Sequence, residues 1–144
     1  MIEVIKIIVQ QNNWAQDLGL CVIRIAIGLI FVKHGSLKIA RGMQELAWTG
    51  EQMKYLGITF APLFWGIMAM LAEFVGGVCL TLGLGTRLVS PFLAFTMLVA
   101  VLYHVGKRDP WGYISHPLAL LFVFVGLTIA GSGTYSLDHF WFGR

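Results

Sequence analysis

Two charged residues lie inside apolar stretches that are long enough to cross a lipid bilayer. Arg24 lies within residues 18–35, and Glu73 lies within residues 61–83. A charge at bilayer depth costs roughly 2.5–3.5 kcal/mol on insertion scales, so such residues are usually paired, hydrated or functional. An arginine and a glutamate at this depth could bind a polar headgroup, a quinone or a proton.

Arg24 and Glu73 are expected to meet inside the membrane. If their helices run antiparallel, Arg24 lies about 9 Å and Glu73 about 15 Å from the same membrane boundary. An arginine side chain can bridge that difference, which predicts an interaction, either direct or through water or a ligand. Two interpretations are open: the pair fixes the register of the two helices, or it lines a polar cavity that binds a ligand.

Three histidines are expected at the opposite membrane boundary, where they form a predicted polar rim with a lysine. Such histidines could hold a metal or haem, or could hydrogen-bond and protonate a quinone carbonyl. The sequence has no HxxxH or HxH spacing, so a metal or haem site is the weaker interpretation. A pocket for a quinone or another amphiphile and unliganded interface histidines are the alternatives. The predicted rim consists of His34, Lys38, His104 and His116.

Cys21 and Cys79 lie in different apolar stretches, without a CxxC motif or the Cys/His spacing of a metal site. Each is predicted to be a small buried hydrophobe. Both fall at nearly the same depth in an antiparallel helix pair, so a disulfide or redox pair is the alternative interpretation.

The composition indicates an integral membrane protein. Of the 144 residues, 58% are hydrophobic and only 12% are charged, and the mean hydropathy is +0.79. About a quarter of the residues in a soluble domain are charged. The net charge of +3 comes from basic residues dispersed among the connections, so no basic tract indicates a nucleic-acid partner. The partner that the composition indicates is the lipid bilayer.

Four membrane-spanning helices nearly fill the chain, because each needs about 20 largely apolar residues. The predicted fold is all-α: an antiparallel four-helix transmembrane bundle that forms a single domain over residues 1–144. Residues 36–60 mix charged and apolar side chains, which predicts an amphipathic segment on the membrane surface. Residues 2–16 suit a short interfacial helix or a tilted entry to the first span. The predicted spans are residues 18–35, 61–83, 88–105 and 111–131.

The first span is expected to end at Gly35. Lys33 and His34 place cations in its last turn, where the helix dipole favours them, and glycine commonly terminates a helix. Lys38 would then lie outside the span, in the surface segment.

Basic residues outside the spans indicate the orientation. The side that carries the termini has Lys6, Arg87 and Arg144, whereas the other side has Lys33, Lys38, Arg41, Lys54, Lys107 and Arg108. By the positive-inside rule, the more basic side faces the cytoplasm. Both termini are therefore expected to face outward.

The C-terminal tail carries the motif Tyr135-Ser136-Leu137-Asp138 after a turn of glycine and serine. Ser136 or Asp138 could cap a short terminal helix, because both residue types accept hydrogen bonds from the free N–H groups at a helix start. A structural turn and cap at the interface is the main interpretation. A ligand-binding role for Asp138 is the alternative.

Three motifs, taken in order, resemble the DoxX family of small four-span membrane proteins, and the likeness covers nearly the whole chain. One departure concerns the start of the fourth span, where the family often has an acidic residue and this chain has His116. An acid-dependent role is therefore not carried over to that position. The motifs are Arg24-x-x-x-Gly28-x-x-Phe31-x-x-His34-Gly35-x-x-Lys38, Glu73-x-x-Gly76-Gly77-x-x-Leu80-x-x-Gly83-x-x-Thr86-Arg87 and Gly131-x-Gly133-x-Tyr135-Ser136-Leu137-Asp138.

The resemblance implies a location in the bacterial cytoplasmic (inner) membrane and a link to redox chemistry. With the charge count, the termini would then lie in the periplasm. Some relatives look like membrane subunits of oxidoreductases, including thiosulfate:quinone oxidoreductase. The first hypothesis is therefore a membrane-embedded redox component that binds a quinone-like molecule, or the membrane subunit of an oxidoreductase complex with a soluble redox partner. The resemblance leaves open whether the chain is itself an enzyme and whether it forms a homo-oligomer.

Two alternatives belong to other functional classes. The first is a non-catalytic anchor or assembly subunit, in which Arg24 and Glu73 are structural and the amphipathic segment docks a soluble partner. The second is a small proton-coupled transporter or lipid-handling protein, in which Glu73 is the proton site. The sequence shows neither interrupted helices nor an inverted repeat, which places the transporter last.

Overall fold

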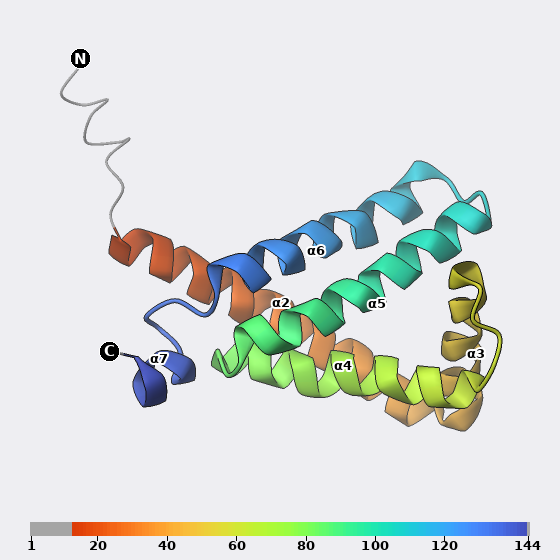
Figure 1. The fold of residues 1–144 in the computed structure, drawn as a ribbon, viewed down its shortest axis with the longest axis horizontal. Coiled ribbons are helices and arrows are strands. Elements are labelled where there is room, and N and C mark those ends of the chain that lie inside the picture. The colour runs from red at the N-terminus through yellow and green to blue at the C-terminus, as the bar shows by residue number, and fades with distance from the viewer. Residues whose placement is uncertain (1–12, 144) are drawn as a thin grey trace, which may run out of the picture.

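A computed structural model describes residues 13–143 of the chain. Most of the segment 2–16, predicted to be a short interfacial helix or a tilted entry to the first span, lies outside these residues. Within the described part, every regular element is a helix, and Figure 1 shows their arrangement. The helices are α2 (Asn13–Arg41), α3 (Met43–Glu51), η1 (Gln52–Leu56), α4 (Pro62–Leu82), α5 (Thr86–Gly106), α6 (Trp111–Ala130) and α7 (Leu137–Phe142).

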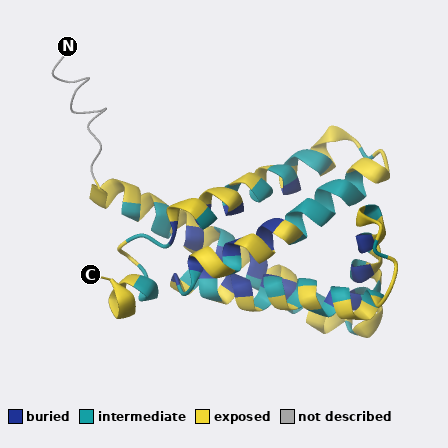
Figure 2. Cartoon of the chain, in the orientation of Figure 1, coloured by how far each residue is buried: buried dark blue, intermediate teal, exposed yellow. Residues whose placement is uncertain are grey.

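Helices α2, α4, α5 and α6 are each long and apolar enough to cross a membrane. Large apolar side chains, among them Val22, Leu88 and Ile129, are exposed on their outer faces, which Figure 2 shows in yellow. Such faces suit hydrocarbon, since lipid tails are as apolar as leucine, and each helix satisfies its own backbone hydrogen bonds. The predicted all-α four-helix membrane bundle is confirmed.

The limits of three spans agree with the predicted limits to within two residues, but α2 differs. It continues unbroken to Arg41, so the predicted end at Gly35 is wrong. Gly35 is buried within the helix, and a Cβ at this position would lie 2.6 Å from the backbone nitrogen of Phe74 on α4. The glycine allows close helix contact rather than ending the helix. Gly42, with φ of 79°, follows the true helix end.

Glycines bring α2 and α4 into direct backbone contact. A Cβ on Gly28 would lie 2.7 Å from the carbonyl oxygen of Gly77, and a Cβ on Gly77 would lie 2.7 Å from the backbone nitrogen of Val32. Small residues of this kind let membrane helices approach closely, where van der Waals packing holds them together. With Gly28 beside Gly77 and Gly35 beside Phe74, the two helices are antiparallel and their register is fixed.

The apolar core lies in the half of the bundle nearer to α7. Phe31 of α2 packs edge-to-face on Phe124 of α6, with ring centroids 5.0 Å apart. This contact connects two helices that are far apart in the sequence. The buried members of the core are Phe31, Leu80, Leu93, Ala94, Phe124 and Leu127.

The predicted amphipathic segment forms α3 and η1, after its first six residues have completed α2. Figure 1 shows α3 crossing the end of the bundle that lies away from α7. Backbone contacts join α3 to α4, because any Cβ on Gly50 or Gly66 would collide with a carbonyl of the other helix. Leu46 and Met53 are buried, whereas Met43 and Trp48 are exposed. The segment is therefore one wall of the bundle as well as an amphipathic surface.

Candidate functional site

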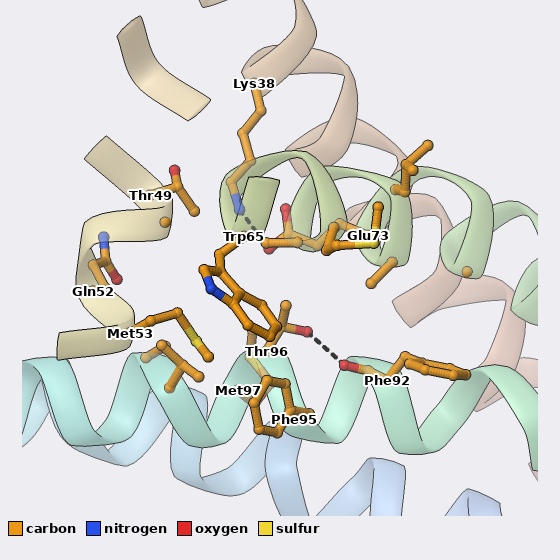
Figure 3. Close-up of a pocket in the computed structure, with 18 of the residues that line it drawn as sticks. Lys38, Thr49, Gln52, Met53, Trp65, Glu73, Phe92, Phe95, Thr96 and Met97 are labelled. Carbon is orange, nitrogen blue, oxygen red and sulfur yellow. Dashed lines mark hydrogen bonds and ion pairs between the residues drawn. The ribbon is translucent and has the colours of Figure 1, made fainter. Parts of the chain in front are cut away.

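A cavity of about 930 Å³ lies between α3–η1, α4 and α5. Figure 3 shows its lining: Trp65 points into the space, and Lys38 and Glu73 lie together at one side. The lining is mainly apolar, which is typical of sites for small organic ligands, and the volume falls within their usual range. Its apolar members include Met53, Trp65, Met68, Phe92, Phe95 and Met97, and its polar members include Lys38, Thr49, Gln52, Glu73 and Thr96.

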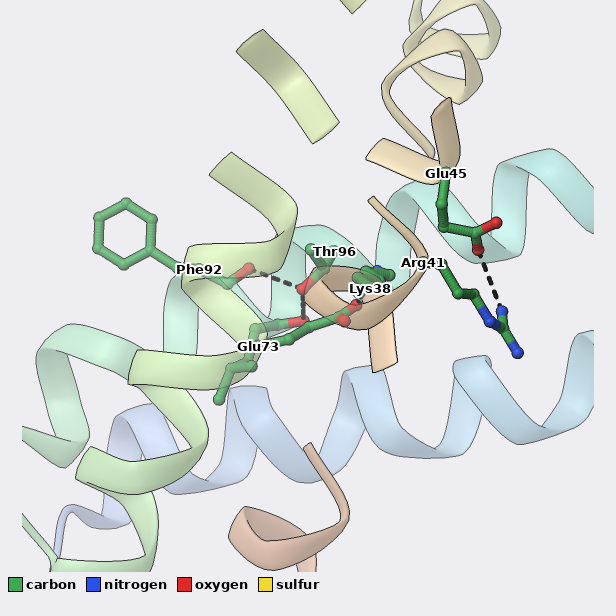
Figure 4. Close-up of polar contacts among 7 residues, drawn as sticks. Lys38, Arg41, Glu45, Glu73, Phe92 and Thr96 are labelled. Carbon is green, nitrogen blue, oxygen red and sulfur yellow. Dashed lines mark hydrogen bonds and ion pairs between the residues drawn. The ribbon is translucent and has the colours of Figure 1, made fainter. Parts of the chain in front are cut away.

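The polar side of the cavity is an ion pair between Lys38 and Glu73. Lys38 Nζ lies 2.7 Å from Glu73 Oε1, and the side chains are 18% and 7% exposed. Figure 4 shows the two side chains meeting between α2 and α4. Glu73 lies near the middle of α4, and Lys38 reaches it because α2 continues past Gly35. The bilayer-depth carboxylate is therefore paired, as its cost of burial requires.

The predicted direct contact between Arg24 and Glu73 is not formed. Arg24, which is 1% exposed, donates to the carbonyl oxygen of Leu80 at 3.1 Å and to that of Tyr135 at 2.6 Å. Its guanidinium also lies against Gly83, ten residues along the chain from Glu73, which is about 15 Å along a helix. The expected depth difference of about 6 Å between the two residues is too small. The glycine contacts set a register in which α2 extends beyond the end of α4.

Arg24 belongs instead to a network that attaches the C-terminal tail to the bundle. Ser136 accepts a hydrogen bond from His139 N at 3.1 Å, so the predicted cap of the terminal helix is confirmed for this residue. Asp138 has a different role: it accepts from Gly85 N at 2.7 Å and from Thr86 N at 3.3 Å. The carboxylate thus binds the free N–H groups at the start of α5, where the helix dipole favours a negative charge.

Tyr135 contributes its backbone carbonyl to this network, while the residue itself is about half exposed. The three tail residues are therefore brought together with Arg24 and the α4–α5 turn, and they lie away from the cavity. The geometry of the tail motif is that of a structural clasp.

In the described part of the chain, the four residues of the predicted polar rim do not form one site. Lys38 lines the cavity, while His34 and His116 are exposed on α2 and α6. His104 Nδ1 lies 2.7 Å from Asp109 Oδ2, and its ring stacks on Tyr113 with centroids 6.0 Å apart. Among the described residues, no hydrogen bond or ring contact joins any two of these three histidines, and no group of His, Cys, Asp and Glu is placed to hold a metal ion.

The turn between α5 and α6 carries a further polar contact near His104. Lys107 Nζ donates to the Tyr103 hydroxyl at 2.8 Å, and this hydrogen bond raises the pKa of Lys107 above its ordinary value. Cys21 and Cys79 are both free and partly buried, so no disulfide joins them.

Three polar atoms that line the cavity region are buried and have no hydrogen-bond partner within residues 13–143. They are Glu73 Oε2, Thr49 Oγ1 and Trp65 Nε1. A buried polar group left unpaired costs about 1–3 kcal/mol, which makes each of them a point where a ligand would be stabilised. Sequence reasoning identified Glu73 by its depth but missed Thr49 and Trp65, because neither residue type is unusual in an interfacial segment or at the start of a span.

Comparisons with known proteins agree with this architecture. The DoxX family model matches residues 19–106. The chain is 28% identical to "Putative oxidoreductase CatD" of Bacillus subtilis (strain 168) over 130 residues, which cover 90% of this chain and 92% of that protein. It is 32% identical to "Inner membrane protein YqjF" of Escherichia coli (strain K12) over 127 residues, which cover 86% of this chain and 92% of that one. No solved structure matches at a significant level. The family match over more than half of its length shows that this multi-span membrane protein belongs to the DoxX family.

Proposed function

We propose that this protein is a membrane-embedded redox component of the bacterial inner membrane whose cavity binds a quinone-like amphiphile. The observation that carries the proposal is the buried Glu73 Oε2, which lies unpaired among the described residues at the side of a largely apolar cavity of about 930 Å³. The names of two relatives add support, since one is called an oxidoreductase and the other an inner membrane protein.

The lining of the cavity suits a molecule with a polar ring and an apolar tail. Met68 of α4 and Phe92 of α5 come from spanning helices, so their apolar surface lies at the depth of the lipid tails. Lys38 can donate a hydrogen bond to a ring oxygen, and Glu73 can accept one from a ring hydroxyl. The indole of Trp65 offers an aromatic face. A quinone, when bound, would supply the capacity to carry electrons and protons together.

Within this proposal, the chain binds and orients the quinone, and a partner exchanges electrons with it. Glu73 would accept or release protons at the ring oxygens, as a carboxylate within hydrogen-bonding distance can do. Lys38 would hold the carboxylate in place through the bond to Oε1. The protein would then be the membrane subunit of an oxidoreductase complex with a soluble redox partner.

The test is direct binding to protein reconstituted in nanodiscs of phosphatidylcholine. A decyl-substituted dimethoxybenzoquinone is titrated while tryptophan fluorescence is recorded, because Trp48 and Trp65 line the cavity. Saturable quenching is expected in the wild type. Ala100→Phe fills the cavity from α5 and should weaken binding at least about tenfold, whereas Ala26→Phe on the exposed face of α2 should not change it.

Two other results would favour a different function. Failure of the wild type to bind, together with the absence of quinone from its extracted lipids, would favour the non-catalytic anchor. A pH-driven flux into proteoliposomes that is lost in Glu73→Gln would favour the transporter. If Ala100→Phe and Ala26→Phe bind the quinone equally well, the quinone binds outside this cavity.

A further inference from the structure

We propose that the cavity selects the reduced, hydroxyl-bearing form of its ligand, a quinol, over the oxidised quinone. This inference rests on the proposed function and specifies which redox form the same site recognises. It depends on the hydrogen-bonding capacity of one buried group, the Glu73 carboxylate.

Glu73 presents one occupied and one unoccupied oxygen. Oε1 accepts from Lys38 Nζ at 2.7 Å, and Oε2 is buried without a partner among the described residues. A carboxylate in an ion pair has acceptor oxygens only, so Oε2 can be satisfied only by a donor.

Thr96, which lines the same cavity, does not supply this donor. Thr96 on α5 directs its hydroxyl to the carbonyl oxygens of Phe92 at 3.1 Å and Leu93 at 2.9 Å. Figure 4 shows the bond to Phe92. A hydroxyl has one proton to donate, so the bonds to its own helix leave none for Glu73. No described side chain donates to Oε2, so a ligand that enters the cavity can supply the missing donor.

The two redox forms of a quinone differ in this one property. The oxidised ring carries carbonyl oxygens, which only accept and would face the Glu73 oxygen with like partial charge. The reduced ring carries hydroxyl groups, which donate, and a hydrogen bond to a carboxylate is about twice as strong as one between neutral groups. Glu73 therefore favours the quinol and opposes the quinone.

The other unpaired atoms of the site do not discriminate between the forms. Trp65 Nε1 is a donor and needs an acceptor, and Thr49 Oγ1 can serve in either direction. Oxygens that accept are present in the quinone and in the quinol. The preference for the reduced form is thus assigned to Glu73 alone.

The experiment compares both redox forms on the same nanodisc protein without oxygen. The decyl-substituted dimethoxybenzoquinone and its hydroquinone are titrated separately into wild type, Glu73→Gln and Glu51→Gln. Glu51 is an exposed carboxylate on α3 outside the cavity lining, so its variant is the matched control. Wild type and Glu51→Gln are expected to bind the hydroquinone at least about tenfold more tightly. In Glu73→Gln the ratio should fall to within about threefold, because an amide can both donate and accept.

The outcomes distinguish a failure of the inference about the redox form from a failure of the proposed function. Equal affinity for both forms, or tighter binding of the quinone, would overturn the inference and leave the proposed function standing. Failure of the wild type to bind either form would overturn the proposed function itself. A preference that survives in Glu73→Gln would overturn the assignment to this residue.

Two further measurements test the inference even if the Glu73→Gln variant fails to fold. In the wild type, a tenfold preference for the quinol raises the midpoint potential of the bound couple by about 30 mV over the free couple, and an unchanged or lowered potential would contradict the inference. Trp65→Phe should weaken both redox forms by the same factor and leave their ratio unchanged, with Trp14→Phe on the exposed start of α2 as its control. A changed ratio would show that the selectivity does not lie at Glu73.

Discussion

Lys38 Nζ lies 2.7 Å from Glu73 Oε1, although the two residues are 35 positions apart in the chain and belong to helices α2 and α4. The contact exists because Gly35 lies against Phe74, which brings the last turns of α2 alongside the middle of α4. The pair closes one side of the apolar cavity. It therefore connects the packing of the first two spans to the site where we propose that a ligand binds.

Lys38→Met should destabilise the protein by about 3 kcal/mol, because it leaves the Glu73 carboxylate charged and unpaired in the bundle. The double variant Lys38→Met with Glu73→Gln should recover most of this loss, since the uncompensated charge is then removed. Unfolding in mixed micelles with increasing denaturing detergent measures both values. A single variant as stable as the wild type would show that the ion pair contributes nothing to the fold.

Gly35→Ala should lower stability by about 1–3 kcal/mol, because the added methyl group would meet the backbone of Phe74 and force α2 and α4 apart. The matched control is Gly19→Ala on the same helix, where a Cβ would meet nothing within 4 Å. The control should be neutral or slightly stabilising, since alanine is the better helix former. Thermal unfolding in detergent compares the two, and equal melting temperatures would contradict the close contact.

Arg24→Gln should release the C-terminal tail without emptying the cavity. The variant loses the bonds from Arg24 to Leu80 and Tyr135, which hold the tail against the end of α4. Chymotrypsin cleavage at the tail aromatics should become about 10–30-fold faster, because local opening becomes easier. Arg41→Gln, at an exposed surface ion pair, is the control and should leave the cleavage rate unchanged.

The same Arg24→Gln protein separates the clasp from the ligand site. Quinone binding should stay within about twofold of the wild type, because Arg24 contacts a turn that lies about 15 Å from Glu73. A large loss of binding in a folded variant would show that the two polar sites act together.

The charge distribution predicts that both termini face the periplasm. A C-terminal alkaline phosphatase fusion should therefore be active in cells, whereas a fusion to the turn after Lys107 should be inactive. The reverse pattern would invert the topology and place the more basic end of the bundle outside.

Several features could be predicted from the sequence because they depend on neighbouring residues only. The four spans follow from local hydropathy, and the limits of α4, α5 and α6 follow from the turns that flank them. The cap at Ser136 is a contact between residues three positions apart. The motifs that indicated the DoxX family are likewise local strings of residues.

The partner of Glu73 was decided by the tertiary structure. The sequence showed that a carboxylate at this depth needs a partner, but the choice between Arg24 and Lys38 depends on helix register, which the contacts of Gly28 and Gly35 with α4 determine. The partners of Asp138 were also decided by the tertiary structure, because its bonds to Gly85 and Thr86 join residues that are 53 and 52 positions apart. The cavity also depends on the tertiary structure, because it forms only when α3 folds back on α4. This folding makes Thr49 and Trp65 lining residues of the cavity. Hydropathy fixes which segments enter the membrane, whereas close packing between distant segments determines which polar groups meet there.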